Sequence, residues 1–182
     1  MLHATTRLTA GQAAPDFHMS DTTGHEQTLQ NYHGAPLLLS FYRSPDCPLC
    51  SLRLYQLRLT YPTLQQHGLR VLVIFEATSE LVTRYAGSQH PPFPLIADPQ
   101  RRLFARYAVN AHWSGLRGLL RLGAYWRAWR LQVGGRITTG RVDQLPADVL
   151  IGPDGIITHI YYGKDIGDHL PLPTLLTLLH PS

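Results

Sequence analysis

Residues 41–50 read FYRSPDCPLC, and this stretch holds both cysteines of the 182-residue chain, with two residues between them. Its first residues end the apolar run Leu37–Tyr42, which is typical of a buried strand. Pro48 suits the first turn of a helix, and apolar residues recur at helical spacing from 49 to 66. The cysteine pair is therefore expected where a buried strand gives way to a helix.

The chain around this helix predicts a strand–helix–strand unit. A second apolar run, Arg70–Phe75, is expected to form a strand parallel to Leu37–Tyr42, joined to it by a right-handed crossover. Pro62 predicts a kink or break late in the helix, because proline lacks an N–H and clashes with the preceding turn.

Turn and capping residues predict the remaining elements. Between two apolar runs, Gly152-Pro153-Asp154-Gly155 has turn chemistry, which predicts an antiparallel hairpin. Together the elements predict an α/β fold, a mixed sheet with helices on both faces. The other expected elements are a short helix from Ser79 closed by Gly87, a strand within 93–97, a helix capped by Asp98 and continuing to Tyr107, hairpin strands at 148–151 and 156–162, and a last helix at 172–179.

Composition predicts one folded domain over residues 1–182. Hydrophobic residues make up 44% and charged residues 15%, which is typical of a globular chain. No apolar stretch approaches the roughly 20 residues of a membrane span, and the N-terminal residues lack the apolar core of a secretory signal. Two cysteines are too few for a secreted disulfide scaffold, so a cytoplasmic location is expected.

The spacing of Cys47 and Cys50 favours redox chemistry over structural roles. A zinc site needs about four ligands, and none of the ten histidines forms an H-x3-5-H pair, so no metal is expected. A structural disulfide across two residues would restrict the unfolded chain very little, and inert buried thiols remain an alternative. A cysteine at a helix N-terminus instead becomes a reactive thiolate, to which Arg43 could add positive charge, while Asp46 would oppose it.

Three stretches resemble the thioredoxin-like superfamily, and within it the peroxiredoxin-like branch, the alkyl hydroperoxide reductase and thiol-specific antioxidant family. They are GQAAPDF at 11–17 with Gly24, the FYR-Cys-Pro-x-Cys pattern within 41–50, and GKDIGDH at 163–169. The resemblance implies a thioredoxin-like fold, with a helical insertion before the last hairpin.

The same resemblance assigns positions to the site residues. Peroxiredoxins carry P-x-x-x-T-x-x-C after this strand. An alignment without gaps puts Arg43 at their proline, Cys47 at their threonine and Cys50 at their peroxide-attacking cysteine. Pro146 stands where the family has an arginine. It matches instead the cis proline that thioredoxin-like proteins place opposite the cysteine pair, so a cis, site-facing Pro146 is expected.

The resemblance leaves the reaction open between related mechanisms. The first is thiol–disulfide exchange, in which Cys47, expected to be the more exposed cysteine, attacks a disulfide in a protein and Cys50 resolves the mixed disulfide. The second is peroxidase chemistry on the same pair, with either cysteine as the attacker. The third is a redox sensor without catalysis. The enzymatic mechanisms need a thiol reductant and no cofactor.

Residues 110–141 form a basic insertion with six arginines and no acidic residue, which accounts for more than the net charge of +4. A basic amphipathic helix is expected within 113–133, with its apolar face packed on its own domain. A homodimer contact, a lid over the site and a membrane-surface contact are the alternatives. No nucleic-acid motif is present. The residues expected on the apolar side are Leu119, Leu122, Tyr125, Trp126, Trp129 and Val133, and His112 and His169 are expected to be surface or hydrogen-bonded residues rather than catalysts.

Overall fold

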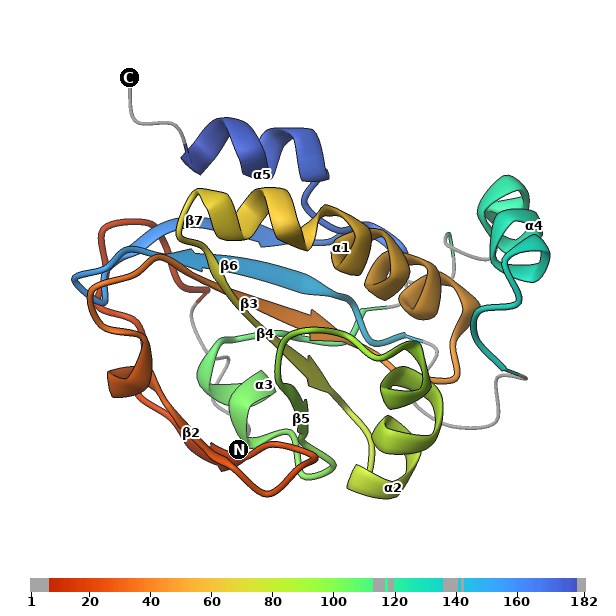
Figure 1. Ribbon diagram of the computed structural model, residues 1–182, viewed down its shortest axis with the longest axis horizontal. Coiled ribbons are helices and arrows are strands. Elements are labelled where there is room, and N and C mark those ends of the chain that lie inside the picture. The colour runs from red at the N-terminus through yellow and green to blue at the C-terminus, as the bar shows by residue number, and fades with distance from the viewer. Residues whose placement is uncertain (1–6, 113–116, 118–119, 136–140, 142, 180–182) are drawn as a thin grey trace.

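A five-stranded mixed sheet forms the centre of the computed structural model, which describes residues 7–112, 117, 120–135, 141 and 143–179 (Figure 1). The strand order is β5–β4–β3–β6–β7, with β3, β4 and β5 parallel and β6 antiparallel to both β3 and β7. The predicted α/β class and the strand–helix–strand unit are therefore confirmed. The strands are β3 (Leu37–Tyr42), β4 (Arg70–Phe75), β5 (Leu95–Ala97), β6 (Ala147–Ile151) and β7 (Ile157–Tyr162).

Helices cover both faces of this sheet (Figure 1). On one face α1 (Pro48–Gln66) lies beside α5 (Leu172–Leu179). The leucines of α1 fill the core between this helix and the sheet. On the other face lie α3 (Arg102–Arg106), the short helix η1 (Leu29–Tyr32) and a hairpin of β1 (His18–Ser20) and β2 (Glu26–Thr28). The hairpin was not predicted, because each strand has only three residues and no apolar alternation.

The predicted break at Pro62 is wrong, because α1 continues through it to Gln66. Proline removes only one backbone N–H from the helix. Tyr61 and Leu64 on the last turns are buried in the core, and this packing holds the helix in register beyond the proline.

The expected helix from Ser79 is confirmed, but Gly87 does not close it. α2 (Ser79–Leu81) runs into the π-helical turn η2 (Val82–Ala86) and the 3-10 turn η3 (Gly87–Gln89), so the helical segment passes through Gly87. It ends at His90, which adopts the left-handed conformation with φ of 49°. Beyond the glycine, the Arg58 guanidinium donates to the carbonyl of Gln89 at 2.8 Å and the Gln89 amide donates to the carbonyl of Ser51 at 3.2 Å, which ties the last turn to α1.

The expected caps and turns are present. The carboxylate of Asp98 accepts the N–H groups of Arg102, Leu103 and Phe104 at 2.8 to 3.2 Å, and so satisfies the first turn of α3. The turn between β6 and β7 is closed by the N–H of Gly152, which donates to the carbonyl of Ile156 at 2.7 Å.

The basic insertion contributes α4 (Leu122–Arg130), which packs beside the N-terminal end of α1 (Figure 1). The predicted helix is confirmed in part, since residues 113–116, 118 and 119 lie outside the described residues. The orientation predicted for its apolar side is wrong. Ala128 is buried and Ala124 and Tyr125 are partly buried, whereas Leu122, Trp126 and Trp129 are exposed. Small side chains face the domain because the helix approaches it closely.

Candidate active site

Cys47 is the N-terminal cap of α1, just after β3 ends. Its carbonyl accepts the N–H of Ser51 at 2.9 Å, which starts the helical ladder. The Ser51 hydroxyl in turn donates to the carbonyl of Pro45 at 2.9 Å and fastens the preceding turn to the helix. The sequence therefore places the first cysteine sulfur where unpaired helix amides and the positive end of the helix dipole meet.

This environment separates the two thiols electrostatically. A hydrogen bond from the Cys50 thiol, together with the charge of Arg43 and the amides of Cys50 and Leu49, lowers the pKa of Cys47 to about 6 against the opposing effect of burial. The same hydrogen bond, burial and the charge of Cys47 raise the pKa of Cys50 well above its usual value. At neutral pH the pair therefore holds a thiolate on Cys47 and a thiol on Cys50.

Both sulfurs lie beneath the surface, which corrects the expectation that Cys47 would be exposed. Cys47 is 0% exposed and Cys50 is 1% exposed. The segment after α4 covers the motif, where the N–H of Gly135 donates to the carbonyl of Asp46 at 3.0 Å. A side chain at Gly134 would place its Cβ 2.8 Å from the Cα of Pro48, so only glycine permits this close approach.

Arg43 is buried beside the cysteines. Its side chain is 1% exposed, and its charge interacts with Cys47, Cys50 and Asp46. Its guanidinium also hydrogen-bonds to the sulfur of Cys47. Asp46 is also buried rather than turned to solvent, and its carboxylate accepts the Ser44 hydroxyl, which together with Arg43 offsets its charge. The Arg43 guanidinium therefore lies beside the sulfur of Cys47.

Pro146 lies beside the end of β3, because Ala147 pairs with Phe41. The peptide bond before it is trans, since the described residues contain no cis peptide bond, so the predicted cis form is wrong. That prediction came from the resemblance to thioredoxins, whereas the chain itself favours trans by about 0.5–1 kcal/mol at an ordinary proline. The carbonyl of Pro146 accepts the N–H of Gly163 at 2.9 Å.

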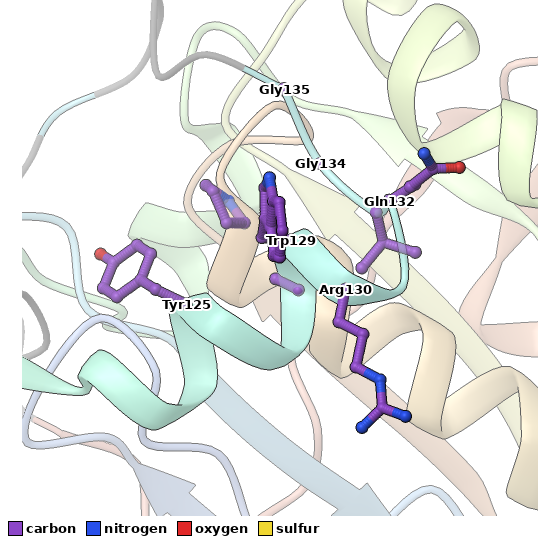
Figure 2. A pocket seen from close by; sticks show the side chains of 9 residues that line it. Tyr125, Trp129, Arg130, Gln132, Gly134 and Gly135 are labelled. Atoms are coloured by element: carbon purple, nitrogen blue, oxygen red, sulfur yellow. The ribbon is translucent and has the colours of Figure 1, made fainter.

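A cavity of about 730 Å³ opens between α4 and the start of α1, next to Pro48 (Figure 2). Tyr125, Trp129 and Arg130 line it from α4, and Figure 2 shows Arg130 extending away from Trp129. The Tyr125 hydroxyl is buried and has no hydrogen-bond partner among the described residues. Burial raises the pKa of Tyr125, and the nearby negative charge of Cys47 adds to this. No sequence pattern identifies this tyrosine as a site residue, because it reaches the site from the insertion.

The GKDIGDH stretch holds the start of α4 in place. The guanidinium of Arg121 donates to the carboxylate of Asp165 at 2.8 Å and lies 3.8 Å from that of Asp168. Gly167 brings this loop against Arg121 and Leu49, because the ideal position of a Cβ at Gly167 is 3.2 Å from both side chains. A motif that looked like part of the family pattern therefore ties the insertion to the first turn of α1.

A buried polar cluster centred on Asp148 lies behind the site, and no sequence pattern predicts it. Its carboxylate accepts the Ser40 hydroxyl and the N–H of Leu170 at 2.7 Å, and lies 3.1 Å from Nδ1 of His169. The His169 ring stacks on Tyr42, with centroids 4.5 Å apart. His169 is thus hydrogen-bonded, as expected. Asp148 could not be recognised because these partners come from β3 and the segment before α5.

The pKa of Cys47 sets the pH dependence of the thiolate. Because the pKa is lowered to about 6, the thiolate absorbance of the reduced protein should appear as pH rises through about 6 rather than about 9. Arg43→Gln should move this midpoint upward, because a stabilising charge is lost. Arg70→Gln is the matched control, because Arg70 begins β4 at the edge of the sheet opposite the cysteine motif. It should leave the midpoint of the titration unchanged. A midpoint near 9 in the unaltered protein would contradict this assignment.

Comparison with known proteins places these features in a family. The family model described as AhpC/TSA family matches residues 10–160. A putative peroxiredoxin of Mycobacterium tuberculosis is 30% identical over 105 residues, which cover 58% of this chain and 67% of that protein. The thiol-disulfide oxidoreductase ResA of Geobacillus thermodenitrificans is 30% identical over 106 residues, which cover 58% of this chain and 60% of that one.

Solved structures of peroxiredoxins share this fold. Peroxiredoxin Q of Xanthomonas campestris superimposes with a TM-score of 0.68 at 16% identity, covering 94% of each chain. A mutant of Xylella fastidiosa PrxQ gives 0.69, covering 95% of this chain and 94% of that one. These similarities confirm the predicted thioredoxin-like architecture.

A thioredoxin-like sheet with a cysteine pair at the start of its first long helix defines a thiol-dependent oxidoreductase. This chain belongs to the AhpC/TSA family, whose model spans most of its length. The sequence-based prediction of a peroxiredoxin-like thiol oxidoreductase is thereby confirmed.

Proposed function

We propose that Cys47 is the attacking thiolate and Cys50 the resolving thiol of a dithiol peroxidase cycle. The observation that carries this assignment is the hydrogen-bonded pair itself, in which the pKa of Cys47 is lowered to about 6 and that of Cys50 is raised. The thiolate is the nucleophile in both peroxide and disulfide chemistry. This choice differs from the alignment without gaps, which would make Cys50 the attacker.

The steps balance with a hydroperoxide and an external dithiol. The Cys47 sulfur attacks the terminal peroxide oxygen, the O–O bond breaks, and water or an alcohol leaves after gaining a proton. Cys47 is then a sulfenic acid, and the Cys50 sulfur displaces its oxygen as water to form the disulfide. An external dithiol supplies two electrons by thiol–disulfide exchange and restores both thiols. Because the cysteines are already adjacent, resolution needs no distant third cysteine.

Burial favours a small oxidant over a protein disulfide. With both sulfurs at most 1% exposed, a folded protein's disulfide does not reach Cys47 unless the cover from α4 moves. A hydroperoxide is small enough for the cavity beside Pro48. The guanidinium of Arg43, beside the Cys47 sulfur, and the hydroxyl of Tyr125, which has no hydrogen-bond partner among the described residues, are donors for its oxygens. They stand in place of the threonine and arginine of the family pattern, which this chain lacks.

Thiol–disulfide exchange on a protein substrate is the second candidate. It uses the same attack by Cys47 and the same resolution by Cys50, and a relative named as a thiol-disulfide oxidoreductase supports it. We place either reaction in the cytoplasm, where thiol reductants keep cysteine pairs reduced.

The two candidates differ in which oxidant reacts with the reduced protein. The reduced protein is mixed with hydrogen peroxide or, separately, with a small model disulfide at equal concentration. Mass spectrometry of samples quenched over time then gives the rate with each oxidant. We expect peroxide to produce the intramolecular disulfide faster. Faster reaction with the disulfide would make exchange the principal activity. Slow reaction with both would contradict an enzymatic role and favour a redox sensor.

A further inference from the structure

α4 carries an exposed apolar strip that its packing on the domain does not use. Ala124, Tyr125 and Ala128 turn toward α1 and the cysteine motif. Leu122, Trp126 and Trp129 lie on a different side of the helix, at positions i, i+4 and i+7. They are 75%, 56% and 76% exposed, and we call these three residues the outer strip.

The outer strip is the centre of the largest concentration of exposed apolar side chains in the described part of the chain. Of the seven large apolar side chains that are exposed there, five lie within residues 120–131, including Leu120 at 80% and Leu131 at 43%. Scattered exposed leucines are ordinary, but a local concentration marks a surface that binds something.

The charges around the outer strip indicate an anionic occupant. Arg127 and Arg130 are exposed on the same helix, and the Arg130 guanidinium lies 5.5 Å from the Trp126 ring centroid. Arg121 is engaged by Asp165 and Asp168, so it belongs to the anchor of α4 rather than to this surface. The sequence from 110 to 141 contains six arginines and no acidic residue, and the acids that pair with Arg121 and Arg141 lie outside it.

A second copy of the chain fits this surface poorly. A two-fold contact through the outer strip would gather Arg127 and Arg130 of both copies around one apolar seam, without a carboxylate from this segment to offset four like charges. Tryptophan, leucine and arginine on one exposed helix face are instead the composition that settles at a lipid headgroup layer. There indole rings sit at the interface and arginines meet lipid phosphates.

We propose that the outer strip of α4, flanked by Arg127 and Arg130, binds the surface of a membrane that contains anionic lipids. The contact is peripheral, because no helix among the described residues is long and apolar enough to cross a bilayer. Trp129 and Arg130 also line the cavity at Pro48. When the protein is bound to a membrane through the outer strip, the mouth of that cavity therefore lies at the lipid headgroups.

Vesicle binding by the full-length reduced protein tests this proposal. All three tryptophans of the chain, Trp113, Trp126 and Trp129, lie in the insertion, so intrinsic fluorescence reports on this segment alone. We expect cosedimentation and a blue shift of the emission with vesicles of phosphatidylcholine and phosphatidylglycerol. Vesicles of phosphatidylcholine alone should bind far less, and high salt should weaken the binding.

Variants separate the contribution of each group. Trp126→Ser with Trp129→Ser should lower partitioning at least about tenfold, and Arg127→Gln and Arg130→Gln about fivefold each. Leu59→Ser, which removes a 59% exposed leucine from α1, is the matched control and should bind as the unaltered protein does. Absence of binding to either vesicle, or equal loss in Leu59→Ser, would overturn the proposal. A dimer that forms without vesicles and dissociates in the tryptophan variants would assign the strip to a second copy instead.

Discussion

Cys50→Ser is expected to stop the cycle at the sulfenic acid of Cys47. The variant keeps the attacking thiolate but has no thiol to displace the oxygen, so one equivalent of hydrogen peroxide should leave a sulfenic acid that dimedone traps at residue 47. The pKa of Cys47 should rise, because the hydrogen bond from Cys50 is its largest lowering influence, although a serine hydroxyl at this position retains part of it. Mass spectrometry of the trapped protein gives the measurement.

Cys47→Ser should instead lose the fast reaction. In this variant the hydrogen bond and the charge of Cys47 no longer raise the pKa of Cys50, but burial still does, so Cys50 should remain mostly a thiol at pH 7 and the rate with peroxide should fall at least about tenfold. The chain has no other cysteine, so the double variant supplies the background rate. A fast sulfenic acid at Cys50 in Cys47→Ser would reverse the assignment and restore the attacker that the family alignment suggests.

Asp148→Ala should destabilise the fold more than any surface substitution. The carboxylate is fully buried and binds the Ser40 hydroxyl, the Leu170 N–H and His169, and Arg53 lies 4.0 Å away. Removing one partner of such a buried polar cluster leaves the others unsatisfied, which costs about 3–5 kcal/mol. Urea denaturation should show this loss, whereas Glu80→Ala, on the exposed side of α2, should stay within about 0.5 kcal/mol.

The pH dependence of this contribution has a defined sign. Burial alone would raise the pKa of Asp148, but the charge and hydrogen bond of His169, with Arg53 and Ser40, lower it to about 2. A carboxylate whose pKa is lower in the folded state stabilises the protein above its ordinary pKa near 3.8, and this stabilisation is lost as pH falls toward 2. The difference between the unaltered protein and Asp148→Asn, about 2 kcal/mol at neutral pH, should therefore shrink below pH 4. A difference that stays constant to pH 2 would exclude this linkage.

The fold was predictable because its signals are local. The apolar runs at 37–42 and 70–75 have the length and composition of buried strands, and Gly152–Gly155 has turn residues in turn order. Errors occurred where packing outweighed local preference. α1 passes Pro62 because its last turns are buried, and the segment after Ser79 continues past Gly87, where Gln89 is hydrogen-bonded to Arg58 and Ser51 of α1.

Only the site residues that lie close together in the sequence were predictable. Cys47, Cys50 and Arg43 lie within eight residues of one another, and the structure brings them together as the sequence suggested. Tyr125 and Asp148 lie about 75 and 100 residues away along the chain, and no local pattern connects either one to the cysteines. The cis form of Pro146 was predicted from resemblance alone, and the geometry contradicts it, as it contradicts the expected exposure of Cys47.

The sequence by itself therefore determined the sheet, the placement of a cysteine pair at a helix start, and the thiol chemistry that follows from it. These depend on hydrophobic periodicity, capping and the helix dipole, which act over a few residues. Only the tertiary structure decided that Cys47 is the covered thiolate and that α4 turns its tryptophans outward. Burial and charge at these positions depend on contacts between segments distant in sequence, because a pKa and an exposed surface are properties of the packed molecule.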